Sequence, residues 1–152
     1  MWRIYYLWAL IHNLNVMATI ENIWVWNKAV EFAKDVYKLC KDNANIYKDF
    51  WLRDQIQRSA LSIPSNIAEW ADRWSQKEFL RFLFIARWSC SELKTQMHIV
   101  KKLDYIADAD FKNIMDKLDE IHKMINGFIN TIKKKIEVNQ WLSIFYYLYS
   151  II

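Results

Sequence analysis

The chain has 152 residues, and 54% of them are hydrophobic, which is enough to build the core of one domain. One Gly and one Pro are too few for the frequent tight turns of an all-β fold, so a helical protein is expected. The formal net charge of +4 permits contact with nucleic acid or an acidic partner, but it falls well short of a dedicated polycation.

The two ends of the chain are unusual in composition. Residues 1–16 and 141–152 are apolar and aromatic, yet each is shorter than the ~20 residues that cross a bilayer as a helix. The favoured interpretation is that both are extensions which the native protein lacks, with a natural start at Met17. The alternative is a membrane role. The folded domain is expected to occupy residues 17–140.

A first helix is expected over residues 24–41, because apolar side chains recur there at alternating steps of three and four. The polar segment 41–49 is predicted to be a loop. A second helix follows, and Pro64 inside it removes a hydrogen bond, so this helix should bend or split near Leu61. The inward positions are Trp26, Ala29, Ala33, Val36 and Cys40 in the first helix, and Leu52, Ile56, Ala60, Ile63 and Ile67 in the second.

A third helix begins at a capping box made by Ser75 and Glu78. A fourth runs from Asp108, as N-cap, to about Ile136, and the short loop between them makes the two helices antiparallel. We therefore expect an all-α, antiparallel, up-and-down four-helix bundle. The inward positions are Phe79, Leu83, Ala86, Cys90, Leu93, Met97 and Val100 in the third helix, and Phe111, Ile114, Leu118, Ile121, Ile125, Phe128 and Ile132 in the fourth.

The third helix carries a second line of apolar side chains outside its inward face. These are Leu80, Phe82, Phe84 and Ile85. A helix that is apolar on two sides needs two partners, and a neighbouring subunit is the simplest second partner. The alternative is that this helix lies at the centre of a tightly packed monomer.

The sequence offers no convincing catalytic or metal site. His98 and His122 would lie about 13 Å apart on antiparallel helices, too far to share a metal ion. Asp119 and His122 form only one of the carboxylate–histidine pairs that a di-iron bundle needs. Cys40 and Cys90 are expected to be reduced, packed thiols. We predict a protein that is not an enzyme and has no cofactor or small-molecule substrate.

Basic side chains are the strongest candidates for binding. They are Arg53 and Arg58 on the second helix, Arg73, Lys77 and Arg81, which step by four along the start of the third, and Arg87 further along the third. Arg58, Arg81 and Arg87 are the preferred phosphate contacts, because guanidinium groups bind phosphate through two donors. Glu69 and Glu92 are expected to pair with these arginines and hold them in place. The alternative is an ordinary solvated face.

Three segments of the chain carry a family resemblance. They are Val25-Trp26-Asn27-Lys28-Ala29, the stretch 55–69 with its run Ser62-Ile63-Pro64-Ser65-Asn66-Ile67-Ala68-Glu69, and Phe82-Leu83-Phe84-Ile85-Ala86-Arg87 followed by Ser89, Glu92, Leu93, Thr95 and Gln96. Over Ile20 to about Lys135 the chain resembles the four-helix bundle proteins of the 23S rRNA intervening-sequence family. The resemblance implies a homopentamer with no known enzymatic activity. A similar bundle, the accessory variability determinant of diversity-generating retroelements, is a basic pentamer that binds a reverse transcriptase and nucleic acid.

The chain departs from the family pattern at tryptophans. Trp51, Trp70, Trp74 and Trp88 stand where the family has glycine, and the chain holds nine Trp but one Gly, where a glycine usage near 7% would give about ten. We hypothesise that UGA is a glycine codon in this gene and is translated here as Trp. The alternative is a genuine aromatic surface.

Taken together, the residues and the resemblance favour a cytoplasmic homo-oligomer, a pentamer, that binds RNA, DNA or a ribonucleoprotein. The first alternative is a scaffold that docks a protein partner such as a reverse transcriptase. The second is a membrane-tethered bundle.

Overall fold

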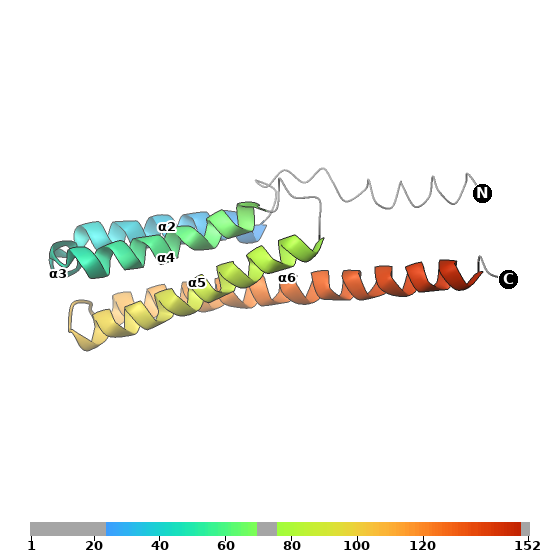
Figure 1. The fold of residues 1–152 in the computed structure, drawn as a ribbon. Coiled ribbons are helices and arrows are strands. Elements are labelled where there is room, and N and C mark those ends of the chain that lie inside the picture. The colour runs from blue at the N-terminus through green and yellow to red at the C-terminus, as the bar shows by residue number, and fades with distance from the viewer. Residues whose placement is uncertain (1–23, 70–75, 150–152) are drawn as a thin grey trace.

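The computed structural model describes residues 24–69 and 76–149, and these are almost entirely helical, with no strand among them. They form α2 (Trp24–Asp42), α3 (Ala44–Lys48), α4 (Phe50–Ala68), α5 (Gln76–Lys102) and α6 (Asp108–Tyr149). In Figure 1, α2 and α4 lie side by side, and so do α5 and α6. The expected all-α class is confirmed. The described ranges hold five helices, four long and one short, where four were expected.

One hydrophobic core runs between the four long helices, and most of the predicted inward positions line it. All seven predicted positions of α5 are buried, as are Ile56, Ala60, Ile63 and Ile67 of α4. Trp26, Leu52, Phe111 and Phe128 are only partly buried against this core. Helical periodicity therefore identified the packed faces, because side chains three or four apart share one side of a helix.

The segment predicted as a loop contains the short helix α3. Asn43 begins it, since its Oδ1 accepts hydrogen bonds from the backbone N–H groups of Asn45 and Ile46 at 3.1 and 3.0 Å. Its Nδ2 donates to the carbonyl of Tyr105 in the loop between α5 and α6, at 2.6 Å. Ile46 is fully buried and anchors the turn. The capping asparagine and one apolar residue are enough to fold a polar segment.

Helix α4 is continuous through Pro64, so the predicted alternative of two separate helices is wrong. The proline is buried, and nearby side chains donate to carbonyls one turn before them: Ser65 Oγ to Leu61, at 2.9 Å, and Asn66 Nδ2 to Ser62, at 2.8 Å. Carbonyls of this turn thus gain donors close to the hydrogen bond that proline cannot make.

Helix α5 ends without a glycine. Asp104 has a φ of 54°, and the N–H groups of Asp104 and Tyr105 donate to the carbonyls of Lys101 and Val100, both at 3.1 Å. This pair of bonds is the Schellman motif, in which a left-handed residue closes the helix. The chain therefore turns back at once into α6, as the predicted short loop requires.

Helix α6 begins at Asp108 and continues thirteen residues beyond the predicted end at Ile136, to Tyr149. Its 42 residues span roughly 63 Å, against roughly 40 Å for the 27 residues of α5. Figure 1 shows α6 extending past the end of α5. Several side chains of this extension are exposed: Val138, Trp141, Leu142 and Ile144. The predicted tail from residue 141 is part of this helix as far as Tyr149.

The second apolar line of α5 is half-buried within the single chain. Leu80 and Phe84 pack against the core, and Phe82 and Ile85 are also intermediate in exposure. These side chains give less support to a subunit contact than was expected. None of the helices in the described part of the chain has an apolar stretch long enough to cross a bilayer.

Candidate nucleic-acid interface

A line of partly buried polar contacts joins α4 to α5. Gln96 Nε2 donates to Ser59 Oγ at 2.9 Å, and Ser89 Oγ donates to Ser62 Oγ at 2.8 Å. Asn66 Nδ2 also reaches Ser62 Oγ, at 3.0 Å. Because these pairs set Ser59 level with Gln96 and Ser62 level with Ser89, they fix where each basic residue of α4 stands relative to α5.

Arg58 and Arg81 are exposed, and neither has a hydrogen-bond or ion-pair partner within the described ranges. Arg81 lies fifteen residues before Gln96, so the two arginines are roughly 22 Å apart along the bundle. At that separation the two guanidinium groups do not form a single cluster.

Arg87 lies on the other side of α5, toward α6. Its Nη1 donates to Asn126 Oδ1 at 3.5 Å, and its guanidinium carbon is 4.8 Å from the centre of the Phe84 ring. Burial lowers the pKa of His122, and the Arg87 charge lowers it further. Arg87 is therefore partly engaged within its own chain, unlike Arg58 and Arg81.

Arg53 is held at the start of α4. Its Nη1 donates to the carbonyl of Tyr47 at 2.7 Å, and the guanidinium lies 4.9 Å from the Tyr47 ring and 5.3 Å from the Phe50 ring. Stacking of this kind restrains the side chain while other N–H donors stay available.

The remaining predicted residues are more loosely placed. Lys77 is exposed in the first turn of α5, and Arg73 lies outside the described residues. Glu69, at the end of α4, is exposed. Glu92 is exposed too, and across the described residues it forms no ion pair with Arg58, Arg81 or Arg87. Its expected supporting role is not seen in this chain.

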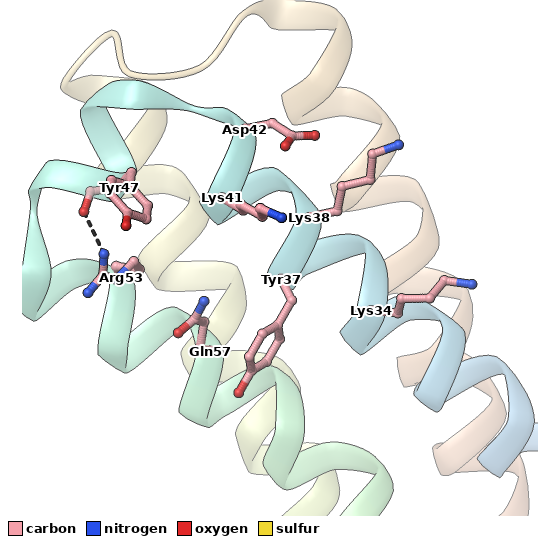
Figure 2. Close-up of a pocket in the computed structure, with 8 residues that line it drawn as sticks. All are labelled: Lys34, Tyr37, Lys38, Lys41, Asp42, Tyr47, Arg53 and Gln57. Carbon is pink, nitrogen blue, oxygen red and sulfur yellow. Dashed lines mark hydrogen bonds between the residues drawn. The ribbon is translucent and has the colours of Figure 1, made fainter.

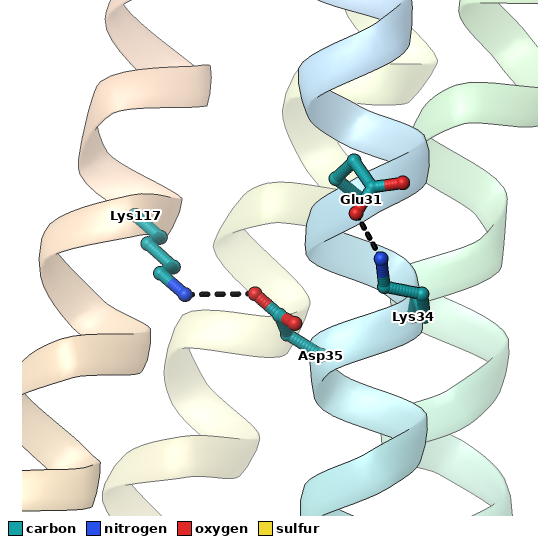
Figure 3. A network of polar contacts seen from close by, with 4 residues as sticks. All are labelled: Glu31, Lys34, Asp35 and Lys117. Atoms are coloured by element: carbon teal, nitrogen blue, oxygen red, sulfur yellow. Dashed lines mark hydrogen bonds and ion pairs between the residues drawn. The ribbon is translucent and has the colours of Figure 1, made fainter.

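Lysines, in contrast, carry the ion pairs recorded for the described residues. Lys117 Nζ of α6 lies 2.7 Å from Asp35 Oδ2 of α2, and Lys34 pairs with Glu31 on α2 (Figure 3). The others are Lys28–Glu120, Lys94–Asp119 and Lys101–Asp108. Five lysines of the described residues are therefore compensated by an acidic partner.

Helix α5 has the largest excess of basic over acidic side chains among the helices that the structure describes. It carries six basic and two acidic side chains, a net charge of +4, whereas α6 carries six of each. Two of the six basic side chains of α5, Lys94 and Lys101, pair with Asp119 and Asp108 of α6.

Both cysteines are buried free thiols. Burial raises the pKa of Cys40 to about 11 and that of Cys90 to about 12. Such thiols are poor nucleophiles. Across the described ranges, no group of three or more His, Cys, Asp or Glu side chains is placed to hold a metal ion.

One feature that the sequence interpretation missed is a groove between α2 and α4, next to α3 (Figure 2). Arg53 was identified as a candidate, but its neighbours were not. The groove is lined by Lys34, Tyr37, Lys38, Lys41, Asp42, Tyr47, Arg53 and Gln57. The exposed Lys34, Tyr37, Lys38 and Lys41, which share one face of α2 at helical spacing, were the available signal.

Comparison with known families gives a direct result. The family model of the 23S rRNA-intervening sequence protein matches residues 21–127. The chain belongs to this family. A solved structure of a protein of unknown function from the S23 ribosomal protein family of Bacteroides thetaiotaomicron is similar, with 30% sequence identity and a TM-score of 0.65. The match covers 69% of this chain and 97% of that one. No curated protein matches.

Proposed function

We propose that this family member is a non-catalytic homo-oligomer, a pentamer, that binds nucleic acid through basic side chains of α4 and α5. One observation carries this hypothesis: Arg58 and Arg81 are exposed and without a partner in the described part of the chain, while five lysines are paired with acids. The family description connects its members with 23S rRNA intervening sequences, which favours RNA as the first ligand to test.

Free arginines favour phosphate binding for a physical reason. Each guanidinium that contacts a phosphate releases condensed counterions, and this release makes binding fall steeply with salt. The log of the affinity changes with log salt by about −0.9 for each phosphate neutralised on a duplex, and by about −0.7 on a single strand. Removing one contacting arginine should reduce the slope by about that amount.

The exposed apolar side chains on the same helices support assembly. Ile99 is 43% exposed and lies eighteen residues, five turns, after Arg81, so the two share one face of α5. On α4, Leu61 is 51% exposed and lies one turn from Arg58. Copies that meet through this apolar surface would repeat the arginines around a shared axis.

The test measures RNA binding by fluorescence anisotropy over a range of salt concentrations. We expect Arg58→Gln and Arg81→Gln each to weaken binding and to reduce the salt slope. Lys112→Gln is the matched control. Lys112 is exposed on α6, so this substitution removes the same charge from another surface. Affinity that does not fall with salt, or equal losses for all three variants, would contradict the proposed contacts. Light scattering counts the subunits, and a stable monomer would contradict the pentamer.

A scaffold that docks a protein partner, such as a reverse transcriptase, is the second candidate. The exposed Leu61 of α4 and Ile99 of α5 favour it, because exposed apolar side chains can form contacts with another protein. Capture of partners after nuclease treatment separates the two functions. A scaffold keeps its partner, whereas a nucleic-acid binder loses whatever the nucleic acid had bridged. A cytoplasmic location goes with either function, since two buried free thiols suit a reducing compartment.

The hypothesis of recoded glycines bears on this surface. Trp51 is 77% exposed and Trp88 is 59% exposed, so neither ring contributes to the core, and replacing either by glycine leaves the packed interior intact. Trp70 and Trp74 lie outside the described residues. Mass spectrometry of the protein from its own cells distinguishes the two residues at each position. Glycine masses at Trp51 and Trp88 are expected, and tryptophan masses there would end the hypothesis.

A further inference from the structure

The groove between α2 and α4 combines aromatic rings with positive charge. It is an open groove with a volume of about 730 Å³. In Figure 2, the Tyr37 side chain of α2 reaches toward Gln57 of α4, and Tyr47 and Arg53 lie beside them. Lys34 and Lys38 extend away from that side of α2, so they belong to the rim.

The charge of the groove is not cancelled from within. Lys34 pairs with Glu31 (Figure 3), but Lys38, Lys41 and Arg53 have no ion-pair partner among the residues the structure describes. Asp42 is the one acidic side chain among the eight that line the groove. A ligand entering here would therefore be attracted through its negative charge.

The aromatic rings are open to solvent. Tyr37 is 40% exposed and Tyr47 is 55% exposed. Arg53 is restrained between Tyr47 and Phe50, and the hydrogen bond to the Tyr47 carbonyl fixes its position. Exposed rings beside a restrained guanidinium offer flat surfaces for stacking together with donors for a phosphate.

We propose that this groove binds single-stranded nucleic acid. Bases stack on Tyr37 and Tyr47, and Lys41 and Arg53 hold the adjacent phosphates. The amide of Gln57, on the wall between them, can hydrogen-bond to a base edge. A duplex is disfavoured, because its bases are paired and stacked on one another and are not free to stack on side chains. An acidic peptide could pair with the cations, but its carboxylates would not stack on the two tyrosine rings.

The tyrosines of this groove lie far from Arg81, the α5 part of the α4–α5 surface. Arg53 belongs to both sites, and Gln57 of the groove is the sequence neighbour of Arg58. Arg53 is six residues before Ser59, which is level with Gln96, so the groove lies roughly 30 Å along the bundle from Arg81. One site can therefore fail its test while the other passes.

The test measures binding of a fluorescent oligouridine by anisotropy at low salt. We expect Tyr37→Leu and Tyr47→Leu each to weaken binding by roughly tenfold, the scale of one lost base–aromatic stack. Trp24→Leu is the matched control. Trp24 is also an exposed aromatic ring of α2 beside a cation, with Lys28 Nζ 4.8 Å from its centre, but it lies thirteen residues from Tyr37.

Competition identifies the ligand class. We expect unlabelled oligouridine to displace the probe, and a duplex RNA or a polyglutamate peptide at equal charge to do so much less well. Binding unchanged in both tyrosine variants would overturn the assignment, and so would displacement by polyglutamate as strong as by oligouridine. Circular dichroism confirms that the variants fold. Arg81→Gln measured beside them reports on the α4–α5 surface alone, so losses at Arg81 without losses at the tyrosines would refute only the groove.

Discussion

The left-handed backbone of Asp104 predicts that valine at this position lowers the free energy of unfolding and that glycine raises it slightly. Its φ of 54° closes α5 through two hydrogen bonds from its own N–H and that of Tyr105. An L-residue in this region loses roughly 1–2 kcal/mol, with Asp affected least after Asn and Gly, and a β-branched residue is a strong outlier there. Asp104→Val should therefore lower the free energy of unfolding by about 1–2 kcal/mol.

Asp104→Gly removes the backbone strain of the folded state. It also raises the conformational entropy of the unfolded chain, which lowers the free energy of unfolding by about 0.5–1 kcal/mol. The net effect should be a gain of no more than about 0.5 kcal/mol, so the two variants should differ by about 2 kcal/mol. For a chain of this size that difference corresponds to roughly 4–8 °C in the midpoint of thermal unfolding. The melting curves are compared at one protein concentration, since association would shift them.

Asp116→Val is the control for this pair. Asp116 is exposed inside α6 and has no left-handed φ, so valine there should cost no more than about 0.7 kcal/mol of helix propensity. Equal losses at Asp104 and Asp116, or a glycine variant less stable than the valine variant, would refute the reasoning about backbone strain.

Three further predictions concern the core, the α4–α5 contacts and the end of α6. With pKa values of about 11 and 12, Cys40 and Cys90 should react with a thiol reagent at pH 8 at least about a hundredfold more slowly than in the unfolded chain. Because the pKa values of both thiols in the folded protein lie above the ordinary 9.0, the thiols stabilise the fold below pH 9, and this contribution is lost as the pH rises through 11. Melting curves that show no loss of stability between pH 9 and pH 11 would contradict this prediction. A double-mutant cycle of Ser62→Ala and Ser89→Ala should give a coupling of about 0.5–1.5 kcal/mol in urea unfolding, and a value near zero would show that the hydroxyls do not interact. Removing residues 138–152 should change the stability of the isolated chain by less than about 1 kcal/mol, because the side chains described there are exposed; a large loss by the same measurement would mean that the extension packs against something.

Much of the core could be predicted from the sequence, because burial in a helical protein follows a short-range period. Leu83, Leu93 and Met97 of α5 repeat at helical steps, and each is fully buried. The ends of elements were less predictable. Helix α3 depends on the side chain of Asn43, and the closing turn at Asp104 depends on a conformation more often assigned to glycine.

The candidate sites were harder to predict than the core. Arg58 and Arg87 look alike in the sequence, but one is free in the described part of the chain and the other contacts Asn126 and Phe84 across the bundle. The groove joins Tyr37 of α2 to Arg53 of α4, and no local pattern records that the two helices meet there. Periodicity reports which face of a helix is buried, whereas partner choice depends on how the helices are aligned.

The hydroxyl and amide contacts between α4 and α5 restrict how those helices can slide past one another. Apolar faces with a repeating pattern would tolerate a shift of about 5.4 Å, one helical turn, because the buried isoleucines of α4 recur at helical spacing. Such a shift would separate Ser59 from Gln96 and Ser62 from Ser89. Each polar group left without a hydrogen-bond partner in the interior would destabilise the shifted alignment by about 1–3 kcal/mol. These few polar side chains therefore select one alignment among several that the apolar core alone would accept. That alignment in turn sets the spacing of the surface arginines.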